Sequence, residues 1–257
     1  MLSMKGKTVL VTGASAGIGR ACAQAFAEAG AKLILAARRV GQIQELASDL
    51  SSRLRTPSLC LALDVRHRKH VEEAVRGLPP EWAEVDVLVN NAGLGRGLDK
   101  LQEGNPDDWE EMLDTNVKGL LYITRAIAPG MVARKQGHII NIGSIAGREL
   151  YPGGNVYCAS KFAVKALTRG LKMDLLGTPV RVSTVDPGMV ETEFSMVRFR
   201  GDKERAAKVY QGLTALTPGD IADAVLWVAT RPLHVDVTEM VILPTAQASA
   251  TMAHREA

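Results

Sequence analysis

The sequence contains few cysteines and no long apolar run, and each shortage excludes a class of protein. Its three cysteines, Cys22, Cys60 and Cys158, are an odd number without C-x-x-C spacing, so we expect neither a disulfide framework nor a zinc site. No unbroken apolar stretch is long enough to cross a bilayer, and residues 1–7 hold no hydrophobic signal core. We therefore expect a cytoplasmic protein without a membrane partner.

An excess of charge of one sign is also missing. The formal net charge is +3, from 31 Lys and Arg against 28 Asp and Glu, which is too small to indicate a nucleic-acid partner. A basic run at residues 66–70 fits the solvated start of a helix better than a binding patch. His67 and His70 could share a helix face, but two histidines without a third ligand do not make a metal site. No metal is predicted.

Length and apolar content are sufficient for one large core. The chain has 257 residues, 46% of them apolar, and one α/β domain is the simplest organisation at that length. Short β-branched apolar runs alternate with amphipathic stretches, which is typical of a buried parallel sheet covered by helices. We expect strands at 7–12, 32–36, 56–63, 85–89, 137–143, 180–186 and 239–243. We expect helices at 20–29, 40–55, 68–78, 106–134, 155–176 and 217–230.

A glycine-rich turn lies between the first predicted strand and helix, at Thr12–Gly19. Strand, glycine turn and helix in this order are typical of a dinucleotide site. Gly13 would permit the tight turn, Gly17 would let a pyrophosphate approach, and Gly19 would let helix and strand pack closely. The helix N-terminus would offer free N–H groups to the phosphates.

The second strand ends in arginines where NAD-binding proteins carry an acid. An Asp or Glu about 20 residues after the glycines would bind the adenosine ribose, but here Arg38 and Arg39 follow the strand. A guanidinium can bind a 2′-phosphate through two hydrogen bonds, which an acid would repel. We therefore predict NADP over NAD, with Arg38 as the first contact, Arg39 as the alternative and a further hydroxyl contact from Ser15.

Three polar features follow later strands. Asp64 ends the third strand and could either accept from the adenine amino group or cap the next helix. The N-N-A-G segment at 90–93 is expected to shape the cofactor pocket. Asn116 lies in the middle of a predicted helix, a poor place for Asn by propensity, so it is either exposed at the surface or makes a specific contact.

Tyr157 and Lys161 lie four residues apart in the predicted helix 155–176, so their side chains share one face. A neighbouring cation favours the phenolate, and we therefore predict that Lys161 lowers the pKa of Tyr157 and makes it a proton donor or acceptor near neutral pH. Ser144 follows the fifth strand at the carboxyl edge of the sheet, the edge where Gly13 begins the glycine turn. Ser144, Tyr157 and Lys161 are thus expected to converge.

With these residues in view, the chain resembles the short-chain dehydrogenase/reductase family over essentially its whole length. The matching elements are T-G-x-x-x-G-I-G at 12–19, N-N-A-G at 90–93, Asn116, Ser144, Y-x-x-x-K at 157–161 and P-G at 187–188. Within the family it is similar to the NADP-dependent 3-hydroxy acid dehydrogenases, through the stretches 143–148, 151–157, 190–195, 197–201 and 244–248. The resemblance implies a single-domain Rossmann fold: a doubly wound, seven-stranded parallel sheet with helices on both faces.

The resemblance also implies a role for each matched residue. Tyr157 would exchange the proton with the substrate hydroxyl, which Ser144 would hold by a hydrogen bond. Lys161 would lower the Tyr157 pKa and bind the nicotinamide ribose, and Asn116 would hold a water in a proton relay. The expected NADP(H)-binding set is Gly13, Ser15, Gly17, Ile18, Gly19, Arg38, Arg39, Asp64, Val65, Asn91, Ala92, Gly93, Tyr157, Lys161, Pro187, Gly188, Val190 and Thr192.

The substrates implied are L-serine, L-allo-threonine, 3-hydroxyisobutyrate and 3-hydroxypropionate, with malonic semialdehyde reduced in reverse. Their carboxylate needs a cation. Arg148, shortly after Ser144, is the first candidate, followed by Arg198 and Arg200 in the polar stretch 188–213, which we expect to be a substrate lid. Family members are usually tetramers, so a homotetramer is expected. Two alternatives stay open: a carbonyl or 3-oxoacyl reductase of the same family, and a non-catalytic NADP-sensing protein.

Overall fold

In residues 2–256, which this computed structural model describes, seven strands form one parallel sheet in the order β3-β2-β1-β4-β5-β6-β7. The strands are β1 (Thr8–Thr12), β2 (Lys32–Ala37), β3 (Ser58–Ala62), β4 (Val87–Asn90), β5 (Gly137–Ile142), β6 (Val180–Pro187) and β7 (Glu239–Ile242). The predicted α/β sheet is confirmed, with strand ends shifted by a few residues. The order reverses between β1 and β4, and the crevice at such a switch point is where open α/β sheets bind ligands.

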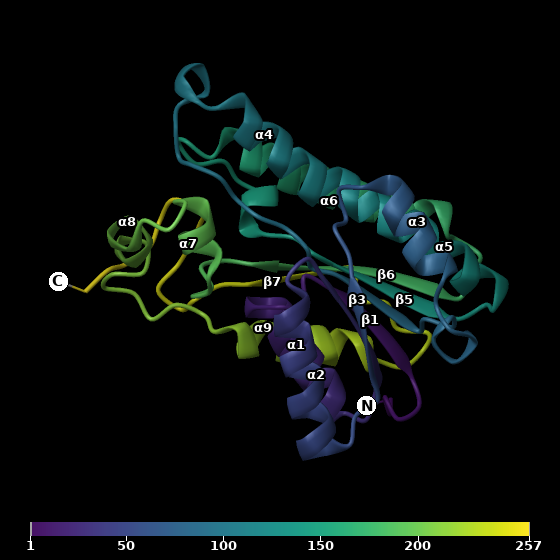
Figure 1. The fold of residues 1–257 in the computed structure, drawn as a ribbon. Helices are drawn as coiled ribbons and strands as arrows, with labels where there is room; N and C mark the ends of the chain where they lie inside the picture. Colours follow the sequence, from purple (N-terminus) through teal and green to yellow (C-terminus); the bar gives the residue numbers. More distant parts are fainter. Residues whose placement is uncertain (1, 257) are drawn as a thin grey trace.

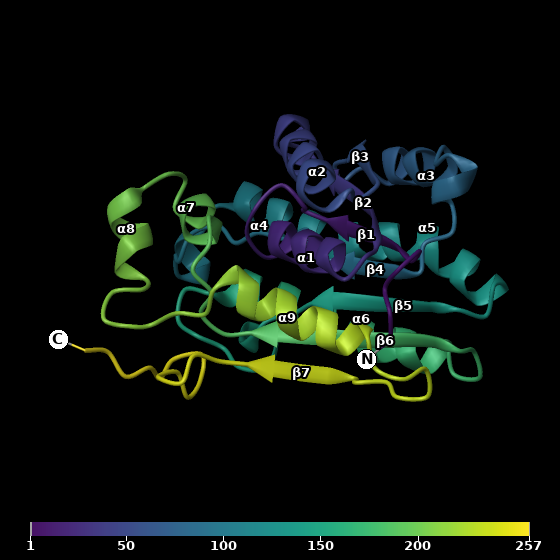
Figure 2. The ribbon, with the colours of Figure 1, turned by 90° about the horizontal axis from the view of Figure 1, so that it is seen from below.

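Helices cover both faces of the sheet, as predicted. One face carries α1 (Gly17–Glu28), α2 (Val40–Leu54) and α9 (Pro218–Ala229), and α1 and α9 pack together. The other carries α3 (Arg68–Arg76), α5 (Leu120–Ala133) and α6 (Asn155–Asp174). Figure 1 shows the two helical layers above and below the sheet, and Figure 2 shows α1 and α9 on the near face when the molecule is seen from below.

The core is divided into two layers by the sheet itself. In β1, Val9 and Val11 pack with the α1, α2 and α9 helices, while Leu10 between them packs on the opposite face. Successive side chains of a strand point to opposite faces, and all five residues of β1 are buried. A strand that is buried on both faces reads as a continuous apolar run, which is why the sequence revealed β1.

The predicted helix 106–134 is interrupted. It consists of α4 (Pro106–Leu113), a π-helical turn at Asp114–Gly119, and α5. Gly119 faces Val65 in the turn, where an added Cβ would lie 2.6 Å from the Val65 side chain. Short π-helical turns often occur at functional sites, and this one contains Asn116.

Two short helices, α7 (Phe194–Arg198) and α8 (Lys203–Lys208), stand outside the layers at the carboxyl edge of the sheet. They form the middle of the predicted lid. No helix within residues 2–256 is long and apolar enough to cross a membrane. Within the same residues, no three His, Cys, Asp or Glu side chains are grouped so that they could hold a metal ion.

Candidate active site

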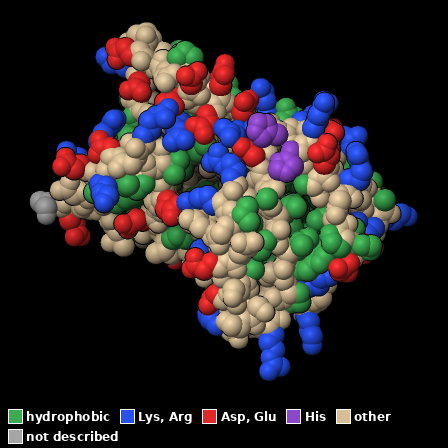
Figure 3. Space-filling model, viewed as in Figure 1, with side chains coloured by type: hydrophobic (Ala, Val, Ile, Leu, Met, Phe, Trp, Pro, Cys, Tyr) green, Lys and Arg blue, Asp and Glu red, His purple; other side chains and the backbone are tan. Residues whose placement is uncertain are grey.

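A cavity of about 1150 Å³ opens at the carboxyl edge of the sheet, between the glycine turn and the α7–α8 segment. Figure 3 shows Lys and Arg side chains gathered around this hollow. The predicted site residues that line it are Gly13, Ser15, Gly17, Ile18, Arg38, Arg39, Asp64, Val65, Asn91, Ala92, Gly93, Ser144, Tyr157, Lys161, Pro187, Gly188, Val190, Thr192, Arg198 and Arg200. Gly19, Asn116 and Arg148 do not line it.

The glycine turn has the geometry that its sequence requires. Gly13 has a φ of +67°, and an added Cβ would lie 2.8 Å from the Asn91 side-chain amide. That amide donates to the Thr12 carbonyl at 2.9 Å, so Asn91 holds the turn in place. Gly19 lies behind the turn, where a Cβ would come within 2.3 Å of the Gly13 carbonyl oxygen. Gly19 therefore permits close packing and does not face the cavity.

The N-terminus of α1 is open toward the cavity. Its N-cap residue is Ala16, which makes no side-chain capping bond, and no acid lies in the first turn. The first N–H groups of a helix have no partner within the helix and carry partial positive charge. This end of α1 is therefore suited to phosphate groups.

Two arginines mark the rim beside the glycine turn, and they differ in their contacts. Arg39 donates to the Ser15 hydroxyl from Nε at 3.2 Å and from Nη2 at 3.1 Å, and its Nη1 pairs with Glu193 at 2.9 Å. Arg38 is half-exposed, and its Nη1 lies 4.0 Å from Glu111. Of the two predicted arginines, the structure thus places Arg39 directly on the glycine-turn hydroxyl.

Asp64 is held by an arginine that the sequence reading missed. Arg66 Nε donates to both Asp64 oxygens at 3.0 Å, and the Arg66 main-chain N–H donates to Asp64 Oδ1 at 3.1 Å. Burial opposes ionisation of Asp64, but the hydrogen bonds and charge of Arg66 outweigh it, and the pKa of Asp64 lies below its ordinary value. The carboxylate does not cap α3, whose N-cap His67 makes no side-chain capping bond. An adenine contact of Asp64 stays a prediction.

Ser144 and Tyr157 meet at the inner wall of the cavity. Ser144 follows β5, its hydroxyl accepts from the Ala146 N–H at 3.1 Å, and it lies close enough to the Tyr157 phenol to favour ionisation of that phenol. Burial raises the pKa of Tyr157, and the charge of Arg198 and the Ser144 hydroxyl offset that rise only in part. The adjoining Cys158 adds to the rise.

The predicted effect of Lys161 on Tyr157 is therefore wrong in direction and in cause. Lys161 Nζ lies 5.9 Å from the centre of the Tyr157 ring and donates to the Ile142 carbonyl at 3.0 Å. Burial also lowers the pKa of Lys161 to about 8, with Asp186 acting against the change. Burial in a deep site destabilises the charged forms of both residues, the phenolate and the ammonium. The i,i+4 spacing alone does not reveal this burial.

Asn116 is buried and makes specific contacts. Its Oδ1 accepts from the Leu94 N–H at 2.8 Å, and its Nδ2 donates to the Leu94 carbonyl at 2.8 Å and to Ser160 Oγ at 3.0 Å. One amide hydrogen thus fixes the loop after β4, and the other binds Ser160 on α6. The predicted water relay at Asn116 stays a prediction.

The three arginines proposed for a substrate carboxylate lie in different surroundings. Arg148 donates from Nε to Asp186 at 2.9 Å and also pairs with Glu239, away from the cavity. Its charge is already engaged, so the structure contradicts Arg148 as the carboxylate ligand. Arg200 lines the cavity but pairs with Asp108 on α4.

Arg198 is the arginine that faces the reaction centre. Its guanidinium carbon lies 4.8 Å from the centre of the Tyr157 ring and 4.9 Å from that of Phe194. Its Nη2 donates to the Tyr151 hydroxyl at 2.9 Å, while its buried Nε has no hydrogen-bond partner among the described residues. Aromatic faces stabilise a guanidinium without neutralising it, so Arg198 keeps its charge for a ligand.

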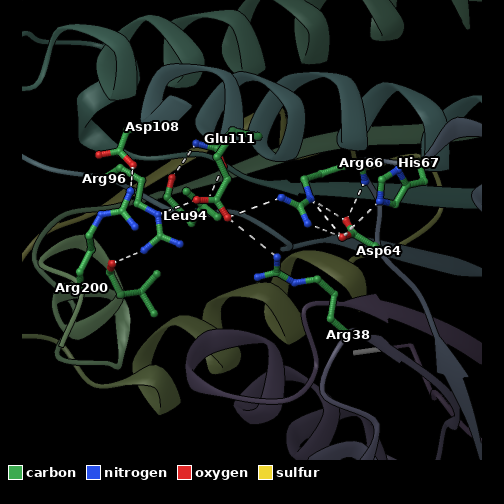
Figure 4. A network of polar contacts seen from close by, with 11 residues as sticks. Arg38, Asp64, Arg66, His67, Leu94, Arg96, Asp108, Glu111 and Arg200 are labelled. Carbon is green, nitrogen blue, oxygen red and sulfur yellow. Dashed lines mark hydrogen bonds and ion pairs between the residues drawn. The ribbon is translucent and has the colours of Figure 1, made fainter. Parts of the chain in front are cut away.

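Several residues in or beside the cavity were not found from the sequence. Arg96 lines the cavity and pairs with Glu111, which does not line it, in a network that Figure 4 shows between α4 and Arg38. Gln247, only 5% exposed, accepts from the Met189 N–H at 2.9 Å. Each is joined to partners tens of residues away, and no local pattern signals such contacts. For Gln247, the stretch 244–248 had marked the region but not the residue.

Comparisons with known proteins agree with this geometry. Residues 7–203 match the short chain dehydrogenase family. The chain is 50% identical over 249 residues to the NADP-dependent 3-hydroxy acid dehydrogenase YdfG of Salmonella typhi, covering 96% of this chain and 99% of that protein. It is 45% identical over 257 residues to the NADP-dependent 3-hydroxy acid dehydrogenase of Schizosaccharomyces pombe, covering 100% and 99%.

Solved structures of similar fold include a closely matching one. The closed form of serine dehydrogenase complexed with NADP+ superimposes with a TM-score of 0.92 at 47% identity, covering 97% of this chain and 100% of that one. A 3-oxoacyl-[acyl-carrier protein] reductase from Brucella melitensis gives a TM-score of 0.81 at 30% identity, covering 94% and 91%.

Proposed function

The chain belongs to the short-chain dehydrogenase/reductase family, and from that membership we propose that it is an NADP(H)-dependent dehydrogenase of small 3-hydroxy acids. The observation that carries the proposal is the meeting of Ser144 and Tyr157 with the lid residue Arg198 at one wall of the cavity. L-Serine, L-allo-threonine, 3-hydroxyisobutyrate and 3-hydroxypropionate are the proposed substrates, with malonic semialdehyde in the reverse direction.

The cavity fits NADP(H). The open N-terminus of α1 and the Gly13 turn suit the pyrophosphate. No acid stands at the end of β2 to repel a 2′-phosphate, and Arg39, fixed on Ser15, and Arg38 are available to bind it. When bound, the nicotinamide accepts or gives the hydride, and the protein supplies orientation and the proton route.

The chain's own residues then handle the substrate hydroxyl. Ser144 holds the hydroxyl oxygen, and Tyr157 takes its proton during oxidation and returns it during reduction. Because burial raises the pKa of Tyr157, the phenol needs a cation near it to act as a base close to neutral pH. Lys161, with a pKa of about 8, and Arg198 are the two cations within reach.

The carboxylate of the substrate is assigned to Arg198. Its guanidinium stands against the Tyr157 ring, and its buried Nε has no hydrogen-bond partner within residues 2–256. A carboxylate held there would lie close enough to the reacting hydroxyl for both groups to belong to one small 3-hydroxy acid. Residues 188–213 form the lid in this proposal, because α7, which carries Arg198, and residues on either side of α8 line the cavity from outside the sheet layers.

A reductase of carbonyl or 3-oxoacyl substrates is the second candidate. The similar 3-oxoacyl-[acyl-carrier protein] reductase favours it. The enclosed arginine at the reaction centre argues for the hydroxy acids, because a thioester has no small free carboxylate. The intact set of Ser144, Tyr157 and Lys161 argues against a merely cofactor-sensing protein.

We also propose a homotetramer in the cytoplasm. Apolar side chains are exposed on α5 and α6, where Leu121 is 41%, Phe162 40% and Met173 68% exposed. Exposed apolar patches of neighbouring helices are typical of subunit contacts. Light scattering coupled to gel filtration would give the mass of the assembly, and a monomer would contradict the proposal.

A substrate panel tests the proposed function. NADPH formation is followed with each of the four hydroxy acids and with matched neutral alcohols, beside NADPH oxidation with a 3-oxoacyl thioester. The hydroxy acids should show the highest kcat/KM. A thioester that exceeds all of them would establish the second candidate, and no turnover with any compound would leave the sensing protein.

A further inference from the structure

Glu111 is a single carboxylate among three guanidinium groups that come from three different segments (Figure 4). Its Oε2 accepts from Arg96 Nε at 2.7 Å, and its Oε1 lies 3.6 Å from Arg66 Nη1 and 4.0 Å from Arg38 Nη1. The hydrogen bond from Arg96 and the charges of the three arginines hold the pKa of Glu111 below its ordinary value, against its partial burial. Glu111 is therefore ionised, and its negative charge interacts with all three arginines.

Arg96 connects Glu111 to the lid. Its side chain is only 16% exposed, and its Nη1 donates to the Val197 carbonyl at the end of α7. The adjoining Gly97 N–H donates to the Arg198 carbonyl at 3.1 Å. The loop after β4 therefore holds the end of α7 at two points, and Glu111 fixes the direction of the guanidinium that makes one of them.

Arg38 carries the same interaction to the cofactor rim. It is 52% exposed, lines the cavity and lies at the outer limit of an ion pair with Glu111. A 2′-phosphate bound to Arg38 would draw its guanidinium away from Glu111 and would repel the Glu111 carboxylate. Both effects should strengthen the ion pair between Glu111 and Arg96.

We propose that Glu111 is a positioning residue that couples the 2′-phosphate of the bound cofactor to closure of the lid, through Arg38 on one side and Arg96 on the other. This inference rests on the proposed function, because it takes NADP(H) as the cofactor and residues 188–213 as the lid. It adds that NADP closes the lid more firmly than NAD even when both cofactors saturate the site.

A second connection between rim and lid exists and gives a rival explanation. Arg39 pairs with Glu193 at 2.9 Å, directly at the start of α7. These side chains are 48% and 54% exposed, and ion pairs at such exposure contribute little because water and salt screen them. Arg38 is equally exposed and lies farther from its partner, so exposure of the arginines does not rank the two connections. Glu111 differs in being only 21% exposed and in bonding the mostly buried Arg96, which contacts α7, and the two connections are separable by mutation.

Limited proteolysis of the lid tests the coupling. Trypsin can cleave after Lys203 and Arg205, which are exposed in the lid, and fragment masses identify these cuts. With saturating cofactor, lid cleavage of the wild type should be at least about 5-fold slower with NADP than with NAD, the low end of usual coupling between sites. Glu111→Gln should bring this ratio to about 1, whereas the matched control Glu110→Gln, on the exposed side of α4, should keep it.

Two further variants keep the result decisive. Arg96→Lys retains the positive charge but has no planar guanidinium to bind Glu111 and the Val197 carbonyl together. In this variant the ratio of lid cleavage with NAD to that with NADP should also fall to about 1. Arg96→Lys takes the place of Glu111→Gln if the latter does not fold. Glu193→Gln should keep the ratio. Equal protection of the wild type by both cofactors, an unchanged ratio in Glu111→Gln, or a loss in Glu193→Gln would each overturn the coupling.

A fluorescence titration with NADPH separates this failure from failure of the proposed function. It reports cofactor binding without any contribution from lid cleavage or turnover. If the protein binds NADPH but shows one of the contradicting ratios, the result contradicts only the proposed coupling. A wild type that does not bind NADPH contradicts the proposed function together with the inference that rests on it.

Discussion

The guanidinium carbon of Arg198 lies 4.8 Å from the centre of the Tyr157 ring, whereas Lys161 Nζ, on the same helix as that tyrosine, lies 5.9 Å from it. The nearer cation at the phenol thus comes from the α7 segment, 41 positions along the chain from Tyr157 (198 minus 157). The proposed substrate recognition and the proposed proton transfer would therefore meet at one contact between α7 and α6.

Replacing Arg198 should impair the use of substrates that carry a carboxylate. Arg198→Met should raise the KM for a 3-hydroxy acid by about 10- to 100-fold, the range expected for losing a hydrogen bond between charged groups. A neutral alcohol of the same length should show a much smaller change. Arg205→Met is the matched control, because Arg205 stacks on Phe199 at 4.5 Å in the same lid but does not line the cavity. Equal losses for both substrates would contradict the carboxylate role.

Replacing Arg148 should affect stability more than recognition. Asp186, whose side chain is 3% exposed, would lose its partner in Arg148→Met, and an unpaired buried carboxylate costs about 2–3 kcal/mol of unfolding free energy. Urea unfolding measures this loss, and the KM for the hydroxy acid should change less than threefold in the same protein. A large rise of that KM at unchanged stability would restore Arg148 as the ligand.

Arg148 also shows where sequence reading stops. The alternation of apolar runs located all seven strands, and the glycine turn and the Tyr157–Lys161 pair pointed to the correct edge of the sheet. Arg148 was favoured because it follows Ser144 closely. Its side chain instead turns to Asp186 and Glu239, which are 38 and 91 residues away, and such partners leave no trace in local spacing.

The π-helical turn and the pKa of Tyr157 escaped prediction for a related reason. Asn116 marked the position as unusual, but the π-helical turn lies where Val65 approaches Gly119, a contact between distant segments that local sequence does not indicate. The direction of the Tyr157 shift depends on burial, which competes with nearby charge. The spacing of residues along a helix indicates which charges lie near Tyr157, but it does not indicate how deeply Tyr157 is buried.

The stability of the protein should rise with pH through the ionisation of Lys161. Burial lowers the pKa of Lys161 to about 8 from an ordinary value of 10.5, so the unfolded chain binds more protons between these values. Its contribution is complete above about pH 10.5 and is lost as the pH falls through about 8. The difference in unfolding free energy between wild type and Lys161→Met should grow by about 2–3 kcal/mol from pH 7 to pH 10. A constant difference would contradict the lowered pKa.

Cofactor preference should depend on the rim arginines, and on Arg39 most. Arg39→Leu should raise the KM for NADP by about 10- to 100-fold, because a charge-assisted contact with the 2′-phosphate is lost. Arg38→Leu should have a smaller effect of the same sign, since Arg38, unlike Arg39, is not fixed on Ser15. The KM for NAD should change little in both. A wild type with a lower KM for NAD than for NADP would contradict this assignment.

The most direct test of Tyr157 as the proton-transfer residue compares NADPH formation from NADP and L-serine, at alkaline pH, in the wild type, Tyr157→Phe and Tyr122→Phe. Tyr122 lies on α5 outside the cavity, so its variant should keep the wild-type rate. Tyr157→Phe should bind NADPH as the wild type does and should lose kcat by about 10²- to 10⁴-fold, the usual contribution of a positioned proton-transfer group. Undiminished oxidation of L-serine by Tyr157→Phe would contradict the central claim.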